Sequence, residues 1–552
     1  MDRPAQLPFT RMRESDPIRP GDCLEIVIER GSSEWLRGAM ALLASALLSA
    51  CGGLPTQLER PVSRARQAPA ESPLVRIAQD SSPAPNLTGF RLMPLGFYSL
   101  DARIQLAQRA SSSLDVQYYL IQNDRTGRLL MRKLRDAALR GVRVRLLVDD
   151  LYTSGGDAMF SGLAAFPNVE VRLFNPFCCA RQSIASKYLA SLGDFGRLNH
   201  RMHNKLFVAD GVAAVMGGRN IADEYFTRSA TSNFVDMDVF VVGAVVPRLE
   251  SIFDVYWNSA QAYPVAAIVG ERADREEAQR GFDHLVDDGE QMMSLSLPPV
   301  DILGYGPIGD DLDAGRLGLV WGTAVAFADQ PAKVMATSLE MARTMSVQMN
   351  IMDRVLTAQN EVVISSPYFV PGPTGVKEFA ELRRRDVKVA ILTNSLAATD
   401  VPQVHAGYAR YRSELLRAGV DLFELSPTRI RQNERLKLPG KSLGSLHAKA
   451  AVIDESMVYI GSMNLDPRSE STNTELGILA ECPELAKEVI RVIDISKLKS
   501  SYHLRFGADG KSLEWVATDD HGDVVFTHEP EVTLFMRLRN ALLAPFVPEQ
   551  LL

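Results

Sequence analysis

The chain has 552 residues, of which 46% are hydrophobic and 23% are charged, and its formal net charge is -7. This length predicts about two to four domains, and the composition excludes a fibrous or globally disordered chain. The negative net charge argues against a protein that binds nucleic acid over its surface, because such surfaces need clustered lysine and arginine.

The first predicted element is an apolar run over residues 38–50, which is typical of an export signal. The run is about thirteen residues long, which is too short to span a bilayer. It ends in Leu48-Ser-Ala-Cys51-Gly52, which resembles a bacterial lipobox, so Cys51 is the predicted site of acylation. The alternative is a short buried helix that ends in an ordinary cysteine. About thirty-five mixed, charged residues precede the run, and we therefore read 1–51 as a signal region whose start is over-extended.

Residues 52–90 are rich in proline, serine, glutamine and charge and show no periodicity, which predicts a flexible tether. Two or more acyl chains on Cys51 would hold the protein on a membrane without a spanning helix. We therefore predict a protein of the bacterial cell envelope that is anchored through Cys51 and faces the periplasm.

Two later regions repeat one pattern of elements. Strand–helix–strand units predict parallel pairing with right-handed crossovers, so each region is expected to be an α/β sandwich. Two such halves can meet face to face, with a site in the crevice between them. The predicted strand, helix and strand lie over 114–120, 128–140 and 142–148, and again over 361–370, 376–385 and 387–393.

The domain boundaries follow from this repeat. We assign residues 91–300 to a first lobe, 301–345 to a connection between the lobes, and 346–552 to a second lobe. Leu114 and His203 are about 89 residues apart, and Val362 and His447 are about 85 residues apart. Each unit therefore carries one histidine at a similar sequence distance from its first strand.

Each unit carries the pattern HxKxxxxD, followed at a fixed distance by G(G/S)xN. In each copy the histidine and lysine are two apart on a predicted strand, so their side chains share one face. A single HxK would be an ordinary solvated strand, whereas two full copies with the same offsets indicate a site. The residues are His203, Lys205, Asp210, Gly218 and Asn220 in the first copy, and His447, Lys449, Asp454, Ser462 and Asn464 in the second.

These residue types suit the transfer of a phosphodiester. The anionic phosphate repels nucleophiles, so two lysines are needed to neutralise its nonbridging oxygens as charge builds in the transition state. A neutral imidazole can attack phosphorus, and a second can protonate the leaving alcohol and later deprotonate the acceptor. Asn220 and Asn464 would donate to the same oxygens. The chemistry needs no metal, and the five cysteines show no zinc-ligand spacing.

Each imidazole also needs an acceptor on its other ring nitrogen. We predict that Asp236 and Glu475, each just before a predicted strand, orient the two histidines, and Asp238 is a rival for Asp236. Asp210 and Asp454 complete the catalytic set, with the expected role of holding the turn that follows each strand.

The duplicated motif resembles that of the phospholipase D superfamily, and more narrowly that of bacterial cardiolipin synthases of the lipoprotein-like or periplasm-facing type. The resemblance runs from about residue 97 to residue 552 and includes Asp115-Val-Gln-Tyr-Tyr119 and the runs 216–225, 366–371, 464–469 and 547–550. The resemblance implies that a phosphatidyl group passes from a phospholipid to an alcohol on a second lipid through phosphohistidine. It implies His203 as the nucleophile, His447 as the acid and base, no cofactor, and phosphatidylglycerol as substrate, with phosphatidylethanolamine as a further candidate.

Three alternatives remain open. A phospholipase D proper would use water as the acceptor, and the motif is the same for both enzymes. A nuclease of the same superfamily also fits the HxK pair, although the acidic chain and the predicted anchor favour lipid, so no nucleic-acid partner is expected. A membrane-tethered binding protein with decayed machinery is disfavoured, because both histidines, lysines and asparagines are present.

Overall fold

The computed structural model describes residues 54–270 except 56, 274–287, 297–543 except 437, 520 and 521, and residue 548. The predicted signal region over 1–51, with Cys51, lies outside the described residues. Within the described ranges, no helix is both long enough and apolar enough to cross a membrane.

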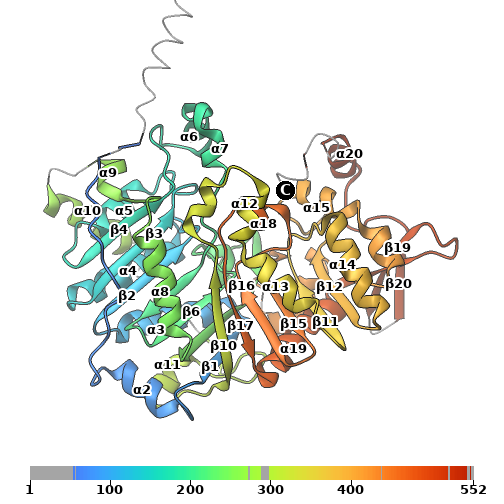
Figure 1. The fold of residues 1–552 in the computed structure, drawn as a ribbon, viewed down its shortest axis with the longest axis horizontal. Coiled ribbons are helices and arrows are strands. Elements are labelled where there is room, and N and C mark those ends of the chain that lie inside the picture. The colour runs from blue at the N-terminus through green and yellow to red at the C-terminus, as the bar shows by residue number, and fades with distance from the viewer. Residues whose placement is uncertain are drawn as a thin grey trace, which may run out of the picture. The chain divides into compact units, whose positions relative to one another are not determined.

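Eighteen of the described strands follow one another in one hydrogen-bonded order (Figure 1). β1 pairs with β10 at the centre, and each half continues outward through corresponding strands. The first half is β1 (Thr88–Met93), β8 (Asp238–Gly243), β6 (Ala213–Gly217), β5 (Leu206–Ala209), β2 (Ser113–Tyr118), β3 (Arg143–Asp149), β4 (Val169–Phe174) and β9 (Ala262–Pro264). The second half is β10 (Val320–Ala328), β17 (Leu476–Glu481), β16 (Met457–Gly461), β15 (Ala450–Ile453), β11 (Glu361–Ser365), β12 (Lys388–Asn394), β13 (Asp421–Leu425), β18 (Ser501–Phe506), β19 (Leu513–Asp519) and β20 (Gly522–Phe526).

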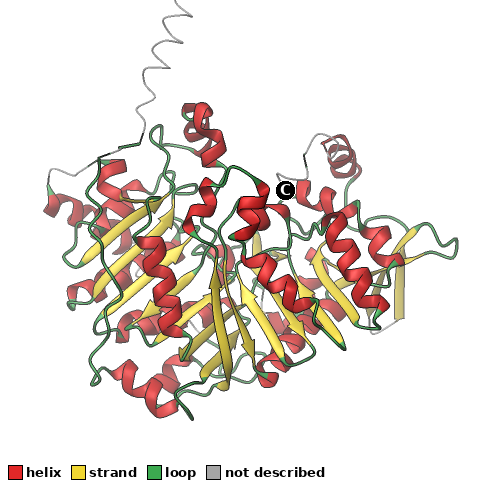
Figure 2. Ribbon diagram, in the orientation of Figure 1, coloured by secondary structure: helices red, strands yellow, loops and turns green. Residues whose placement is uncertain are grey.

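Helices cover both faces of each half (Figure 2). One face of the first lobe packs against α3 (Gly96–Arg109), α4 (Arg125–Leu139) and α5 (Asp157–Leu163), and one face of the second packs against α13 (Val347–Val355), α14 (Gly372–Arg384) and α16 (Arg412–Arg417). The opposite faces share one core with α8 (Val246–Trp257) and α19 (Pro483–Lys499). The two lobes are therefore joined by a common hydrophobic interior.

The remaining helices lie in the connections. They are α2 (Pro73–Ser81), α6 (Ile184–Ala190), α7 (Phe195–Leu198), α9 (Val265–Val269), α10 (Arg275–Asp287), α11 (Ile308–Asp313), α12 (Leu339–Thr344), α15 (Pro402–Ala409), α17 (Pro427–Gln432), α18 (Pro467–Ser471) and α20 (Leu534–Leu543). Short 3-10 turns are η1 (Leu192–Asp194), η2 (Asp223–Phe226), η4 (Pro331–Met335) and η5 (Glu434–Leu436).

The predicted α/β class and the repeated units are confirmed. β2 and β3 pair in parallel around α4, and β11 and β12 pair in parallel around α14. Asp124 caps α4 by accepting the N–H of Gly127, and Gly141 ends the turn after the helix at a φ of 94°, which favours glycine. The strand expected over 361–370 ends at Ser365, because Pro367 has no N–H to donate to a neighbouring strand.

The expected tether over 52–90 differs from the structure beyond about residue 60. Arg172 donates to Pro61 O at 2.7 Å, and Arg145 donates to Ser63 O at 3.1 Å, so this segment is bound to the first lobe. The helix α2 then buries Leu74 and Ile77 in the first-lobe core. Sequence periodicity missed α2 because it has only nine residues, and the buried arginines that bind the preceding carbonyls lie far along the chain.

The expected connection over 301–345 also differs. β10 lies inside it and pairs with β17 along six residue pairs, from Thr323–Glu481 to Ala328–Leu476. The second lobe therefore begins at β10, and the β1–β10 pairing makes this strand the seam between the lobes.

Candidate active site

His203 lies three residues before β5, so His203 and Lys205 precede the strand on which the sequence placed them, and a segment of the second lobe runs beside His203. Its backbone N–H donates to Thr474 O at 2.8 Å, and Met202 and Thr474 form a parallel bridge. Its ring Nδ1 lies 2.9 Å from Oε2 and 3.2 Å from Oε1 of Glu475. The carboxylate that orients the first-lobe histidine therefore belongs to the second lobe.

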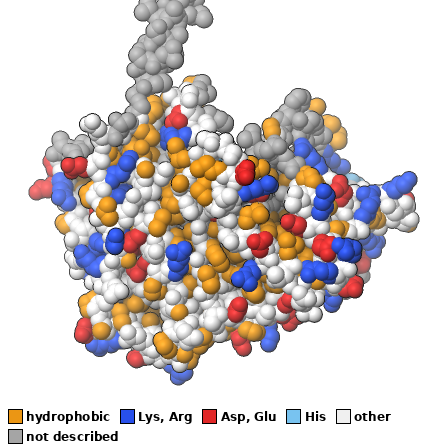
Figure 3. All heavy atoms as spheres, viewed as in Figure 1, with side chains coloured by type: hydrophobic (Ala, Val, Ile, Leu, Met, Phe, Trp, Pro, Cys, Tyr) orange, Lys and Arg blue, Asp and Glu red, His pale blue; other side chains and the backbone are white. Residues whose placement is uncertain are grey.

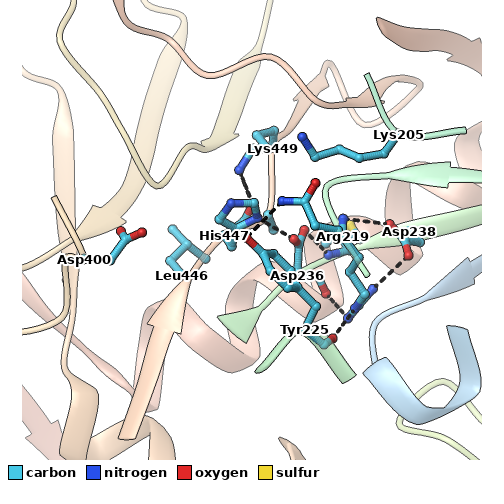
Figure 4. Close-up of polar contacts among 12 residues, drawn as sticks. Lys205, Arg219, Tyr225, Asp236, Asp238, Asp400, Leu446, His447 and Lys449 are labelled. Atoms are coloured by element: carbon cyan, nitrogen blue, oxygen red, sulfur yellow. Dashed lines mark hydrogen bonds and ion pairs between the residues drawn. The ribbon is translucent and has the colours of Figure 1, made fainter. Parts of the chain in front are cut away.

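His447 is placed in the mirrored way before β15. The short strand β14 (Leu443–Leu446) pairs in parallel with β7 (Ser232–Val235) of the first lobe, and His447 N donates to Val235 O at 2.8 Å. The ring Nδ1 of His447 lies 2.6 Å from Asp236 Oδ2, as Figure 4 shows. Each histidine is thus oriented by the other lobe.

This crossed arrangement fixes the chemistry of both rings. A carboxylate on Nδ1 keeps a proton on that nitrogen and leaves Nε2 free to act as nucleophile or base. Both imidazoles and both carboxylates are buried, so water does not compete for these contacts. The sequence predicted Asp236 and Glu475 as partners, and the structure brings both to the histidines.

Lys205 and Lys449 are buried beside the histidines. Each Nζ donates to the carbonyl of the histidine two residues earlier, at 2.6 Å and 2.7 Å respectively, and Lys449 Nζ also lies 3.1 Å from His447 Nδ1. Figure 4 shows the side chain of Lys205 extending toward Lys449 and His447. Burial lowers the pKa of Lys449 to about 8 and holds the pKa of Lys205 well below its usual range. Such a pair of desolvated cations is suited to binding an anion.

The two imidazoles are neutral at neutral pH. Burial lowers the pKa of His203 to about 4; Glu475 opposes this shift and Lys205 adds to it. Burial, followed by the charges of Lys449 and Lys205, holds the pKa of His447 well below its usual range. Because the charge of Lys205, from the first lobe, also contributes to the shift at His447, the two half-sites form one electrostatic unit.

Asn220 and Asn464 lie in the same buried region. Asn220 Nδ2 donates to the hydroxyl of Tyr225 at 3.0 Å, and the amide oxygens of both asparagines are buried without a hydrogen-bond partner. Their predicted role as donors to the phosphate remains a prediction.

Asp238, the rival of Asp236, faces away from the histidines. Its carboxylate accepts from Ser99 Oγ at 2.6 Å and from Arg103 at 2.9 Å, in a fully buried ion pair. Asp236 and Asp238 are two apart but lie on either side of Met237, where β8 begins at Asp238. Asp236 precedes the regular strand, so the two carboxylates reach different partners and Asp238 is not the partner of His447.

Gly218 and Ser462 occupy the same position in the two motifs. Gly218 lies beside the shorter Asp236, and Ser462 lies beside the longer Glu475. A Cβ placed on Gly218 would lie 2.1 Å from Asp236 Oδ1, so only glycine fits there. Ser462 Oγ instead donates to Glu475 Oε2. The shorter aspartate therefore occupies the space that the serine side chain fills in the other lobe.

Asp210 and Asp454 end the motif strands and lie away from the imidazoles. Asp210 has a φ of 53° and accepts the N–H groups of Ser111, Ser112 and Ser113. Asp454 has a φ of 50° and accepts the N–H groups of residues 359–361. Both tie the turn after one strand to the start of β2 or β11, which does not bring them to the substrate region.

Several residues around the imidazoles were not predicted from the sequence. The ring of Tyr119 meets His203 edge-on at 5.0 Å, and Tyr225 and Phe234 contact His447 at 5.1 Å and 4.9 Å between ring centroids. Asp149 and Asn394, the last residues of β3 and β12, accept the N–H of the residue before each histidine, at 2.8 Å in both lobes. A polar residue at the carboxyl end of a parallel strand is the signal that could have identified the last two.

A cavity of about 580 Å³ lies beside the site. Its walls include Met349, Met352, Phe369 and Leu465, together with Asp466 and Thr472. Asp466 follows Asn464 by two residues, so the cavity begins next to the second motif. The motif residues themselves do not line it.

Comparison with known proteins identifies the family. A model of the cardiolipin synthase, phospholipase D-like domain matches residues 103–257 and 351–495, which contain one histidine motif each. The chain belongs to the phospholipase D-like cardiolipin synthase family. Cardiolipin synthase C of Escherichia coli is 39% identical over 467 residues, which covers 82% of this chain and 94% of that protein. Cardiolipin synthase A of Pseudomonas fluorescens is 26% identical over 416 residues, covering 74% of this chain and 68% of that protein.

The fold agrees with this family. The crystal structure of phosphatidylserine synthase from Haemophilus influenzae aligns with a TM-score of 0.52 and 14% identity, covering 87% of this chain and all of that chain. As a member of this family, the protein is an enzyme of the phospholipase D type that acts as a phosphatidyltransferase on phospholipids.

Proposed function

We propose that this cardiolipin synthase-like enzyme makes cardiolipin at the cell membrane by passing a phosphatidyl group through a histidine. The observation that carries the proposal is the pair of crossed contacts, His203–Glu475 and His447–Asp236, with Lys205 and Lys449 buried between them. A neutral His203 with a free Nε2, and a His447 that takes up a proton once phosphate is bound, meet the needs of phosphodiester transfer beside two desolvated cations.

In the first step, Nε2 of His203 attacks the phosphorus of the donor lipid and forms a nitrogen–phosphorus bond. The bond from phosphorus to the leaving headgroup oxygen breaks, and a proton from Nε2 of His447 passes to that oxygen. The anionic phosphate raises the pKa of His447 when it binds, because it offsets the lysine charges that depress this pKa in the free enzyme, so Nε2 of His447 takes up a proton from water before this step.

In the second step, an alcohol of the acceptor lipid gives its proton to Nε2 of His447, and its oxygen attacks phosphorus. The nitrogen–phosphorus bond breaks and His203 is regenerated as a neutral imidazole. Glu475 balances the positive charge that appears on His203 in the intermediate, and Asp236 does the same for His447 when it is protonated. His203 contacts Glu475. Although burial opposes the shift, His203 and Lys205 hold the pKa of Glu475 below its usual range. This ionised carboxylate supports the assignment of His203 as the nucleophile.

The proposed substrates are two phospholipids, with phosphatidylglycerol as acceptor and either phosphatidylglycerol or phosphatidylethanolamine as donor. The partly apolar cavity beside Asp466 supports a second lipid next to the site. Hydrolysis to phosphatidic acid is the alternative, since water could replace the acceptor alcohol. Cleavage of nucleic acid is less favoured: in Figure 3, lysine and arginine are interspersed with aspartate and glutamate over the visible face.

We further propose membrane attachment through an acylated Cys51, with the enzyme in the cell envelope and facing the periplasm. Exposed apolar side chains on connecting helices support contact with lipid, among them Leu189 of α6, Leu339 of α12, and Leu534 and Phe535 of α20. Mass spectrometry of the membrane-extracted protein tests this proposal. A diacylated Cys51 at the mature N-terminus is expected, and an intact, unmodified N-terminal region would contradict it.

The activity is tested by incubating the purified protein in detergent with phosphatidylglycerol, with and without phosphatidylethanolamine, and identifying the products by mass spectrometry. Cardiolipin that is absent with the His203→Ala, His447→Ala double variant is the expected result, and the mixture that works names the donor. Phosphatidic acid alone would make the enzyme a hydrolase. No lipid turnover would contradict both functions.

A further inference from the structure

A buried ion pair lies behind Glu475, in the segment that the sequence assigned to the connection between the lobes. Lys333 Nζ lies 2.7 Å from Asp329 Oδ2, and the exposure of both side chains is 0%. Asp329 directly follows β10, and Lys333 lies in the next turn, η4. Two charges removed from water are tolerated only when further hydrogen bonds satisfy them, and here those bonds lead to the site.

Asp329 forms hydrogen bonds with both the backbone N–H and the backbone carbonyl of Glu475. Its Oδ2 accepts the N–H of Glu475 at 3.0 Å, and its own N–H donates to Glu475 O at 2.9 Å. Its Oδ1 accepts the N–H of Val347 at the start of α13. The backbone of Glu475 therefore cannot shift without disturbing the ion pair.

Lys333 reaches the side chain of Glu475 through Ser469. Lys333 Nζ donates to Ser469 O at 2.8 Å, and Ser469 Oγ donates to Glu475 Oε1 at 2.9 Å. Glu475 in turn binds His203 Nδ1. All four residues are buried, so a continuous set of contacts runs from Lys333 to the imidazole.

The first lobe supports Asp236 with a different cation. The buried Arg219 donates to the carbonyl oxygens of Met93 and Pro94, at the end of β1, and to that of Asp236. Each lobe thus anchors its carboxylate to the end of its first strand through a buried positive charge. The position of Arg219 within the motif is occupied in the second lobe by Met463, which cannot do this.

We propose that Asp329 and Lys333 are positioning residues that hold Glu475, and through it the ring of His203, in place for the transfer reaction. They do not touch the reacting atoms. The kinetic part of this proposal rests on the proposed function of His203, whereas the geometric part can be measured without turnover.

The test uses the full chain in detergent and the variants Lys333→Met and Asp329→Asn. An imidazole Nδ1–H bound to a carboxylate gives a strongly downfield proton NMR signal, and the His203→Ala and His447→Ala variants assign the two signals. Both test variants are expected to shift or remove the His203 signal and leave the His447 signal unchanged. They are also expected to lower kcat about 10- to 100-fold, with KM changed by less than about threefold.

Arg412→Met is the matched control, because Arg412 forms a similarly buried ion pair with Glu424 in the same lobe, away from both histidines. It is expected to leave both signals and kcat close to those of the parent protein. The proposal is overturned if the His203 signal stays in place in the test variants, or if Arg412→Met shifts it equally. Should Lys333→Met fail to fold, the isosteric Asp329→Asn decides alone. If the parent protein transfers no lipid, the proposed function fails while the NMR comparison still decides the positioning role.

Discussion

The two half-sites share a plan but differ in how each carboxylate is held. Glu475, which orients His203, accepts hydrogen bonds from Ser462 and Ser469. Asp236, which orients His447, faces a glycine instead of a serine, and burial raises its pKa. His203, Lys205 and Ser462 hold the pKa of Glu475 below its usual range in spite of burial.

This difference indicates a division of labour. An ionised carboxylate that is fixed by two hydroxyl groups stabilises a persistent positive charge on its histidine, which is what a phosphohistidine intermediate carries. The less stabilised Asp236 suits a histidine that gains and loses a proton within each cycle. The duplicated unit therefore supplies two similar imidazoles with different electrostatic support.

The largest expected effect is the loss of activity when either histidine is replaced, and the same variants distinguish the nucleophile from the acid and base. Replacement of either by alanine should lower activity about 10⁴-fold or more, since one removes the nucleophile and the other the acid and base. Only His447→Ala should still form the covalent intermediate, when the donor lipid carries a good leaving group. Phosphate bound to protein, detected by mass spectrometry after rapid quenching, measures this. Labelling of His203→Ala instead would reverse the assignment.

The second prediction concerns the residue that lies beside each orienting carboxylate, Gly218 in one motif and Ser462 in the other. Gly218→Ser should lower kcat about 100-fold, because its Cβ would lie 2.1 Å from Asp236 Oδ1 and displace the partner of His447. Ser462→Ala removes one hydrogen bond to Glu475 and should cost about tenfold, equivalent to about 1.4 kcal/mol. Steady-state kinetics of both variants provides the comparison. Equal losses would show that the two positions are interchangeable.

The sequence predicted the repeated lobes, because strand–helix–strand order and a doubled motif are local signals. It also selected Asp236 and Glu475, since each lies just before a predicted strand. It could not show that each serves the histidine of the other lobe, because that depends on the β7–β14 pairing and the Met202–Thr474 bridge across the interface. Asp329 and Lys333 were missed for the same reason: their contacts are to residues more than a hundred positions away.

A smaller effect concerns pH. In the free enzyme burial lowers the pKa of His203 to about 4, so the ring stays neutral through the neutral range. Vanadate, as an anionic mimic of the transferred phosphate, should raise the pKa values of both imidazoles by about 1–2 units. The shift should be larger at His447, since burial and then the charges of Lys449 and Lys205 depress its pKa. NMR titration of the ring protons with and without vanadate tests this, and unchanged pKa values would argue against an anion site between the lysines.

The smallest effect compares Asp210 with Asp454, which end the two motifs without touching the histidines. Asp210 is buried and accepts hydrogen bonds from three backbone N–H groups and from two serine hydroxyls, whereas Asp454 is partly exposed and accepts only three backbone N–H groups. Asp454→Ala should therefore lower the free energy of unfolding by about 1 kcal/mol, and Asp210→Ala by more. Kinetic constants of the folded Asp454→Ala variant should match those of the parent protein.

The contribution of Asp454 to the free energy of unfolding should also depend on pH. Although burial opposes the shift, backbone N–H groups hold the pKa of Asp454 below its usual range, so its contribution is present above the unfolded pKa and is lost as pH falls toward the folded pKa. Chemical denaturation at neutral pH and at about pH 3 should show the stability gap between the parent and Asp454→Ala narrowing in acid. A gap that persists unchanged in acid would mean that the turn depends on the side chain's shape and not on its charge. A loss of kcat in Asp454→Ala would instead place the residue in the catalytic machinery, which its distance from the imidazoles argues against.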